Sequence, residues 1–301
     1  MRFSGRVMLA LVALITCAIL AEPPKRPAKR SASGFVALNP TLLRVVWAGF
    51  RPFAADFYWV RTAEQMGAAN TAEQYRDVGI WANLATDLDP RFRLVYEFGA
   101  VAMPFNLGRN TWVNGDESTA LLRKGLKVFP DDYNLQFFLA HNLIFYDHDY
   151  VQAGEVLRRL SERPNAPAFL AQLATRVMAQ GGEIDSAIDF ARSGAANAKD
   201  DETRQTFEER IKQLETEREL QRVDKEIAAF KAREGRLPTT INEMLIKDPL
   251  FQMPMDPSGG EISIDRKGRA RSTSETRRLE ITSSEQKQID AEEEAAEHAN
   301  E

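Results

Sequence analysis

Two histidines with neighbouring carboxylates form the densest group of residues in the sequence that could do chemistry. His141 and His148 stand seven residues apart, and Asp147 and Asp149 flank the second of them. Imidazole and carboxylate groups are ligands by which proteins hold divalent transition metals. The same residues also fit a simpler interpretation, with His141 partly buried in a helix and a polar turn at 147–149. The sequence favours the simpler interpretation, so we predict no metal site and no cofactor.

Catalytic motifs do not accompany these residues. The sequence contains no GxSxG, HExxH, Walker or GxGxxG pattern, and Gly181-Gly182 follows no strand-like segment, as a phosphate-binding loop requires. With three histidines and one cysteine, the chain has neither a disulfide framework nor a CxxC zinc site. We therefore predict that the protein is not an enzyme; an enzyme or metal-binding protein is the third alternative.

An aromatic cluster between residues 50 and 60 is the best candidate for contact with a partner. Helical spacing puts Phe53, Phe57 and Val60 on one side of a helix, and we predict that this side is core. Other aromatic residues of the cluster cannot all share that side, which leaves them for a partner protein or a bilayer surface. These candidate partner-binding residues are Phe50, Tyr58 and Trp59. Burial of the whole cluster in the core is the competing interpretation.

The overall composition is that of a folded globular protein. Hydrophobic residues make up 44% and charged residues 28% of the 301 residues. The net charge of -5 argues against a nucleic-acid-binding function, because no region beyond the N-terminus would collect phosphates.

The first 47 residues are typical of an exported, membrane-linked protein. Arg2 and Arg6 precede fifteen uncharged residues, 7–21, which are too few to cross a bilayer as an upright helix. We predict that 1–21 is a signal peptide or an N-terminal membrane anchor, with lipidation of Cys17 as a further possibility. Residues 22–47 read as a basic, proline-rich linker. This predicts a location on the periplasmic side of a bacterial envelope, anchored to the inner membrane.

A 34-residue period in the middle of the chain is the strongest structural signal. Pro130 and Pro164 are 34 residues apart, and each follows an amphipathic run. On that spacing, Leu139-Ala140 aligns with Leu173-Ala174, and Ala153 aligns with Ala187. Small residues at these positions let paired helices approach closely, and a proline after the second helix ends it.

The pattern resembles the tetratricopeptide repeat (TPR) family. Pro90 and Ala100 mark an earlier unit, which carries an insertion within 106–115, and 52–67 with 71–86 forms a further helix pair. The resemblance implies an all-α solenoid over 48–199, whose concave surface binds other proteins. The repeat-defining residues are Pro90, Ala100, Pro130, Leu139, Ala140, Ala153, Pro164, Leu173, Ala174 and Ala187.

Residues 200–274 follow a different pattern. Apolar residues spaced mainly by three and four predict one long helix over 200–234, with a slip in phase between Leu214 and Leu220. Packing on the last repeat and a coiled-coil dimer are both open for this helix. A short helix over 241–246 and a hairpin made of 261–265 and 269–273 are predicted to follow.

This order of elements resembles the C-terminal region of the type II secretion major pseudopilin. The residues that carry the resemblance are Phe230, Gly235, Pro238, Leu245, Pro254, Asp256, Pro257, Gly259 and Gly260. The resemblance implies a small pilin-like α+β cap. Asp256 could bind calcium, as pseudopilin loops do, or belong to a tight turn, which we favour.

Together these features predict a scaffold that organises or assembles an envelope complex. Partner proteins would bind the concave repeat surface, the N-terminal segment would bind the membrane, and the oligomeric state is left open. Residues 275–301 are acidic and read as a disordered tail. A structural subunit of a secretion or pilus-type machine is the alternative function.

Overall fold

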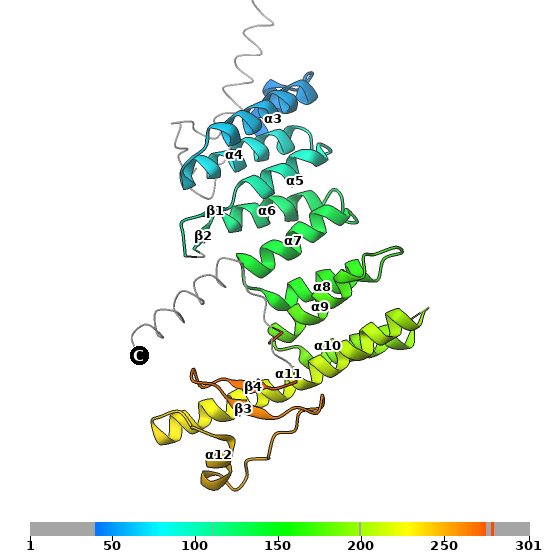
Figure 1. Ribbon diagram of the computed structural model, residues 1–301. Helices are drawn as coiled ribbons and strands as arrows, with labels where there is room; N and C mark the ends of the chain where they lie inside the picture. Colours follow the sequence, from blue (N-terminus) through cyan, green and yellow to red (C-terminus); the bar gives the residue numbers. More distant parts are fainter. Residues whose placement is uncertain (1–39, 110, 199, 275–277, 280–301) are drawn as a thin grey trace, which may run out of the picture. The chain divides into compact units, whose positions relative to one another are not determined.

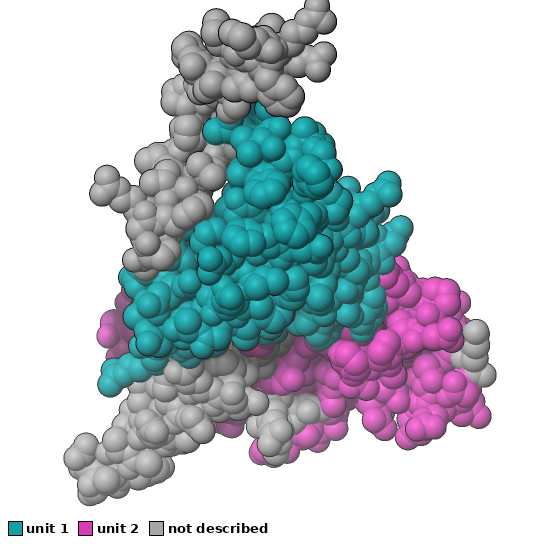
Figure 2. Space-filling model, turned by 90° about the horizontal axis from the view of Figure 1, so that it is seen from above, with its two compact units in different colours: residues 1–142 teal, residues 143–301 magenta. Residues whose placement is uncertain are grey.

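The protein is mostly helical. The computed structural model describes residues 40–109, 111–198, 200–274 and 278–279 (Figure 1). Of the described residues 66% are helical, and these residues form eleven helices and four short strands, which agrees with the all-α class. It divides into two compact units, residues 1–142 and 143–301, with the boundary inside one helix (Figure 2). Predictions on residues 1–39 and 280–301, including Cys17 and most of the acidic tail, lie outside the described residues.

The first unit is a series of helices in which α4 packs on α3, α5 on α4 and α6 on α5. One short antiparallel hairpin interrupts the series at the predicted insertion, pairing Phe105 with Val113 and Asn106 with Trp112. Its elements are α2 (Pro40–Val46), α3 (Arg51–Ala68), α4 (Ala72–Leu88), α5 (Arg93–Ala102), β1 (Phe105–Asn106), β2 (Trp112–Val113), α6 (Gly115–Leu126) and α7 (Tyr133–Phe145), the last of which runs into the second unit.

Helix α2 corrects the predicted extent of the linker. Residues 40–46 are helical, although the sequence predicts a linker over 22–47. Leu43 of α2 is buried in the core of the first unit, and the Arg44 Nε donates a hydrogen bond to the Asp87 carbonyl oxygen at 2.9 Å. Pro40, which lacks a backbone N–H, stands at the first position of the helix, where none is needed. The apolar Leu43 therefore extends the folded region upstream.

The second unit also consists of consecutive helices, which are followed by a small hairpin. Helix α9 packs on α8, α10 on α9 and α11 on α10, while β4 lies on α11. Its elements are α8 (Tyr150–Ser161), α9 (Phe169–Gln180), α10 (Ile184–Ala196), α11 (Asp201–Glu234), α12 (Ile241–Lys247), β3 (Ile262–Ile264) and β4 (Ala270–Ser272). The long helix, the short helix and the hairpin at 200–274 are where the sequence predicted them.

Local capping chemistry fixes several of these boundaries. The side chains of Thr71, Asp149, Asp200 and Thr240 each accept a hydrogen bond from a backbone N–H in the first turn of α4, α8, α11 and α12. Helix α11 ends at Gly235, whose φ of 74° is the left-handed conformation that glycine adopts readily. Among the described residues, no helix is both long enough and apolar enough to cross a bilayer.

The repeat-defining alanines lie in the cores of the two units. Ala140, Ala153, Ala174 and Ala187 are completely buried, and Ala100 is nearly so. Leu139 and Leu173 are partly buried. The three prolines lie on the surface two to four residues beyond the ends of α4, α6 and α8, and these prolines are Pro90, Pro130 and Pro164. Small side chains thus stand where helices approach each other, and prolines stand where the chain turns.

Glycine serves the same purpose at two helix contacts. A Cβ on Gly125 of α6 would lie 2.8 Å from Cγ of Tyr96, and a Cβ on Gly154 of α8 would lie 2.7 Å from Cγ of Met178. These separations are far below a normal carbon–carbon contact of about 3.5–4 Å. The missing side chain is therefore what lets these helices lie so close together.

Candidate functional site

The second unit contains a cleft between α9 and the first turns of α11, which we call the α9–α11 cleft. Its volume is about 580 Å³, within the range of sites that take a small ligand or several side chains. The loop before α9 closes one end. The residues that line the cleft are Ser161, Ala166, Pro167, Ala168, Ala171, Gln172, Asp200, Glu202, Thr203, Thr206, Phe207 and Arg210.

Phe207 forms part of the apolar surface of the cleft, and α10 determines its position. A Cβ on Gly194 would lie 2.5 Å from Cε1 and Cζ of the Phe207 ring, so the ring rests directly on the backbone of α10. Phe207 and Ile211 also pack against the buried Leu214 and Ala191 cluster between α10 and α11. The ring therefore has one face in the core of the unit and part of its surface in the cleft.

The rim of the cleft carries hydrogen-bonding and charged groups. The Asp200 carboxylate accepts hydrogen bonds from the Thr203 amide at 2.7 Å and its hydroxyl at 3.0 Å. These bonds lower the pKa of the Asp200 carboxyl, which is ionised at neutral pH. Glu202 adds a second carboxylate at this end of α11, and Arg210 lines the cleft two turns further along. The site thus combines an apolar surface with charges of both signs.

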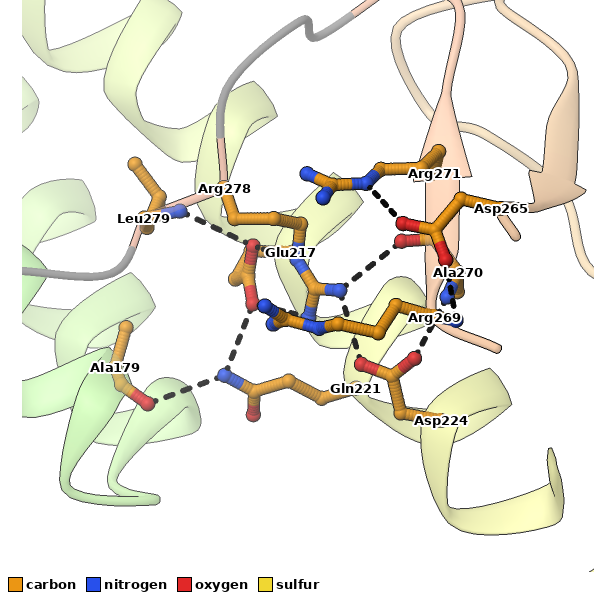
Figure 3. A network of polar contacts seen from close by, with 10 residues as sticks. All are labelled: Ala179, Glu217, Gln221, Asp224, Asp265, Arg269, Ala270, Arg271, Arg278 and Leu279. Atoms are coloured by element: carbon orange, nitrogen blue, oxygen red, sulfur yellow. Dashed lines mark hydrogen bonds and ion pairs between the residues drawn. The ribbon is translucent and has the colours of Figure 1, made fainter. Parts of the chain in front are cut away.

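A buried ion-pair network joins the end of the described chain to the middle of α11 (Figure 3). The Arg278 guanidinium donates two hydrogen bonds of 2.8 Å to the Glu217 carboxylate, one of 2.9 Å to Asp224 and one of 3.0 Å to the Ala270 carbonyl oxygen. The side chains of Arg278 and Glu217 are only 5% and 4% exposed. We call this group the Arg278 joint.

Each charged group of the Arg278 joint has a partner of the opposite charge. Burial alone would lower the pKa of Arg278, but the two carboxylates outweigh burial and raise it. Glu217 also accepts a hydrogen bond from Gln221, and Asp224 accepts one from the Ala270 amide. An arginine stays protonated at all working pH values, so the Arg278 guanidinium remains a cation. The joint fastens the chain after β4 onto α11.

Asp256, for which the sequence allows calcium binding or a tight turn, lies in a turn and is a buried hydrogen-bond acceptor. Its carboxylate accepts hydrogen bonds from the hydroxyls of Thr216, Ser272 and Ser274 and from the Ser258 amide. Burial opposes ionisation, but these four donors prevail and lower the pKa of the Asp256 carboxyl. The loop containing Asp256 is thereby tied to α11 and to the hairpin, which is the turn interpretation in an elaborated form.

The aromatic cluster of α3 is oriented differently from the prediction. Tyr58, a predicted partner-binding residue, is buried and stacks on Trp81 at a ring distance of 5.8 Å. Trp59 is partly buried against Phe92 and Phe98 of the same unit. Phe50 is 70% exposed and remains a candidate for partner contact. The predicted core side is wrong, because it faces outward; its residues are Phe53, Phe57 and Val60.

The reason for this inversion is the position of the smallest side chains. Ala54, Ala55 and Thr62 share the inward side of α3 with Tyr58, and they allow α3 to lie close to α4. An apolar count favours the phenylalanine side, but close helix packing selects the alanine side. The tyrosine hydroxyl does not prevent burial of its ring, and burial raises the pKa of Tyr58.

The two histidines lie in different elements, His141 in α7 and His148 in the turn before α8. In the part of the chain that the structure describes, no group of three or more His, Cys, Asp or Glu side chains could hold a metal ion. His141 is partly buried in α7, and this burial lowers its pKa. His148 lies in the turn before α8, where its Nδ1 is 3.3 Å from the Tyr150 hydroxyl, while Asp149 caps α8. This arrangement is the simpler of the two interpretations.

Comparisons with known proteins assign nothing further. No protein family, no curated protein and no solved structure matches the chain. Sequence reasoning missed the α9–α11 cleft, because its lining comes from three separate segments. It also missed Glu217, Asp224 and Arg278. The sequence did contain one indication of the Arg278 joint. Glu217 lies between Leu214 and Leu220, where the apolar pattern of the predicted helix slips in phase.

Proposed function

We propose that the protein is a membrane-associated scaffold of the TPR type, which binds a polypeptide segment of a partner envelope protein in the α9–α11 cleft. The observation that carries the proposal is the cleft itself. It lies between α9 and α11, which alternate with α10 along the chain. In stacked helix pairs, every second helix lines the concave surface that binds partners.

The packing within each unit supports a repeat architecture. Consecutive helices pack on one another from α3 to α6 and from α8 to α11, and helices two apart also touch, as α3 does with α5, α4 with α6 and α9 with α11. These contacts fit two layers of alternating helices. The buried alanines at the 34-residue spacing fit the same scheme, because they occupy the positions where TPR-type helices approach closely.

The chemistry of the cleft favours a peptide over a metabolite. Apolar surface comes from Ala168, Ala171 and Phe207, and Gln172 and Thr206 can pair with the backbone of a guest. Asp200 and Glu202 at one end favour a basic side chain there. We therefore propose a guest segment with an apolar residue placed against Phe207 and a lysine or arginine near Glu202. The protein performs no catalysis in this proposal.

The proposed location follows from the N-terminal sequence. The uncharged residues 7–21 and the basic residues that follow them suit a chain held at the inner membrane on the periplasmic side. The role would be the assembly or organisation of an envelope complex.

A second candidate function is a structural subunit of a secretion or pilus-type machine. It is favoured by the order of α11, Gly235, Pro238, α12 and the β3–β4 hairpin, which matches the pseudopilin-like pattern in the sequence. Two apolar side chains near α12, Ile246 and Leu250, are 81% and 90% exposed and could contact a neighbouring subunit.

A matched pair of alanine substitutions tests the scaffold proposal. Ala171→Arg fills the cleft with a long charged side chain, whereas Ala229→Arg puts the same side chain on the exposed surface of α11, outside the cleft. Partners would be captured from detergent-solubilised membranes and quantified by mass spectrometry. We expect Ala171→Arg to lose partners that Ala229→Arg retains. Equal recovery with both variants would refute binding in the cleft.

The same assay separates the two candidate functions. If the protein is a subunit, Ile246→Ser with Leu250→Ser should prevent its incorporation into a large complex on a density gradient, and Ala171→Arg should have little effect. If it is a scaffold, the opposite pattern is expected. Circular dichroism would establish that each variant keeps its helical content.

A further inference from the structure

The outward side of α3 and the end of α2 form an apolar surface that the proposed function does not use. We call it the outer face of α3. Its residues are between 47% and 70% exposed, and they are Val45, Val46, Phe50, Phe53, Phe57 and Val60. Trp47 lies beside it, with its ring 6.5 Å from that of Phe53. The three phenylalanines alone expose roughly 300–400 Å² of apolar surface.

This surface is unusual for its place in the unit. Helix α3 packs on α4 through Ala54, Ala55 and Tyr58, so the outer face points away from the helices that follow. The first helix of a stacked array normally turns a polar side outward, because nothing follows to cover it. An apolar patch of this size on a folded protein usually marks an interaction site.

We propose that the outer face of α3 rests in the interfacial layer of an anionic lipid bilayer, as a second membrane contact beside the apolar segment 7–21. The inference rests on the membrane location in the proposed function, but it is independent of the cleft and its guest. The proposed occupant is lipid. The aromatic rings and valines of the outer face would contact the lipid, and basic residues nearby would attract its anionic head groups.

The short linker between segment 7–21 and α2 favours lipid as the occupant of the outer face of α3. Eighteen residues, 22–39, separate segment 7–21 from α2. A chain of eighteen residues spans at most about 60 Å. Four of them, Lys25, Arg26, Lys29 and Arg30, are basic and only Glu22 is acidic, so this linker is attracted to anionic head groups. A chain anchored through 7–21 therefore keeps α3 close to the bilayer.

The side chains of the outer face also suit a bilayer interface. Tryptophan, phenylalanine and leucine side chains are typical of the apolar side of helices that lie in the bilayer interface, and basic side chains are typical of their polar side. Arg61 lies beside this surface, with its guanidinium 5.6 Å from the centre of the Phe57 ring and 2.9 Å from the Glu64 carboxylate.

Two other occupants account for the observations less well. The first alternative occupant is segment 7–21 of the same chain. Its fifteen uncharged residues have no polar side, so the outer face of α3 could cover only part of the segment, and the uncovered part would still need an apolar phase. A second copy of the chain would bury the outer face against itself. That face offers on the order of 500 Å² per partner, which is below the roughly 800 Å² of a standard stable interface.

The test uses the full chain with its other membrane contact weakened. Leu14→Asp with Ile15→Asp places two charges in segment 7–21, and co-sedimentation is then measured with vesicles of phosphatidylcholine and phosphatidylglycerol. In this background, Phe53→Ser with Phe57→Ser should reduce partitioning into the vesicles at least tenfold. The matched control, Ile246→Ser with Leu250→Ser, also removes two exposed apolar side chains and should change partitioning less than twofold.

Three outcomes would overturn the proposal. They are equal partitioning of the Phe53/Phe57 and Ile246/Leu250 variants, the absence of any vesicle binding in the charged background, and a dimer in sedimentation equilibrium that only the Phe53/Phe57 variant loses. Both phenylalanines are largely exposed, so their replacement should leave the circular dichroism spectrum unchanged. Partner capture that is sensitive to Ala171→Arg should also persist in the Phe53/Phe57 variant, which separates failure of this inference from failure of the cleft proposal.

Discussion

Replacing Arg278 by methionine tests whether the Arg278 joint holds the C-terminal part of the second unit together. Methionine keeps much of the length of the side chain but removes all four hydrogen bonds that the guanidinium donates to Glu217, Asp224 and Ala270. The Glu217 carboxylate is then left buried without its cation. Breaking a buried pair in this way costs about 3–5 kcal/mol, since the remaining charge keeps its desolvation penalty. Arg278 and Glu217 are 5% and 4% exposed, so solvent screening reduces this figure little.

Arg271→Met in the β3–β4 hairpin is a matched control for Arg278→Met. Arg271 pairs with Asp265 at 2.8 Å, but the two side chains are 42% and 23% exposed, so Arg271→Met should cost only about 0–1 kcal/mol. Urea unfolding followed by circular dichroism gives the change in the free energy of unfolding. Hydrogen exchange localises it, because the Ala270 amide donates to Asp224 and should exchange faster when the joint opens.

The reasoning would be refuted if Arg278→Met were as stable as Arg271→Met at pH 7 and left exchange at Ala270 unchanged.

Two further outcomes follow from the first unit. Gly125→Ala places a Cβ 2.8 Å from the Tyr96 ring and should lower the free energy of unfolding by about 1–3 kcal/mol. The control, Gly67→Ala in α3, meets no atom within 4 Å and should be neutral or stabilising by up to about 1 kcal/mol. Urea unfolding of the two variants compares these free energies. Burial lowers the pKa of His141 below its ordinary value of 6.5, so the unfolded state binds more protons just below pH 6.5 and stability should fall as the pH drops through that window. His141→Gln should flatten this part of the stability profile, and an unchanged profile would contradict the assignment.

The sequence predicts the helices well because their signals are local. A 3.6-residue apolar period, capping side chains such as Thr71 and Asp200, and glycine after α11 each act within a few residues. The helix α11, the short helix α12 and the β3–β4 hairpin are found where these signals place them. Helix α2 was missed because seven residues give too short a period to stand out from a basic linker.

The orientation of α3 could not be obtained in the same way. Its sequence has two apolar sides, one with phenylalanines and one with alanines and Tyr58. Hydrophobicity alone ranks the phenylalanine side as core, whereas shape decides the matter, since only the alanine side fits closely against α4. The α9–α11 cleft could not be predicted from the sequence either, because it depends on the distance between helices and on the conformation of the loop before α9.

The phase slip in α11 has a physical cause that links the fold to the proposed site. Before the slip, Leu214 packs against α10, and after it Leu220, Val223 and Phe230 pack under the hairpin and α12. The helix changes partners there, so its inward positions become polar, and Glu217 and Thr216 use them to bind Arg278 and Asp256.

One continuous helix therefore carries a wall of the cleft at its start, the polar fastenings in its middle and the hairpin core at its end. A break in the apolar pattern of a long amphipathic helix is thus informative in itself. It marks the place where the chain exchanges one packing partner for another and uses specific polar contacts to fix the exchange.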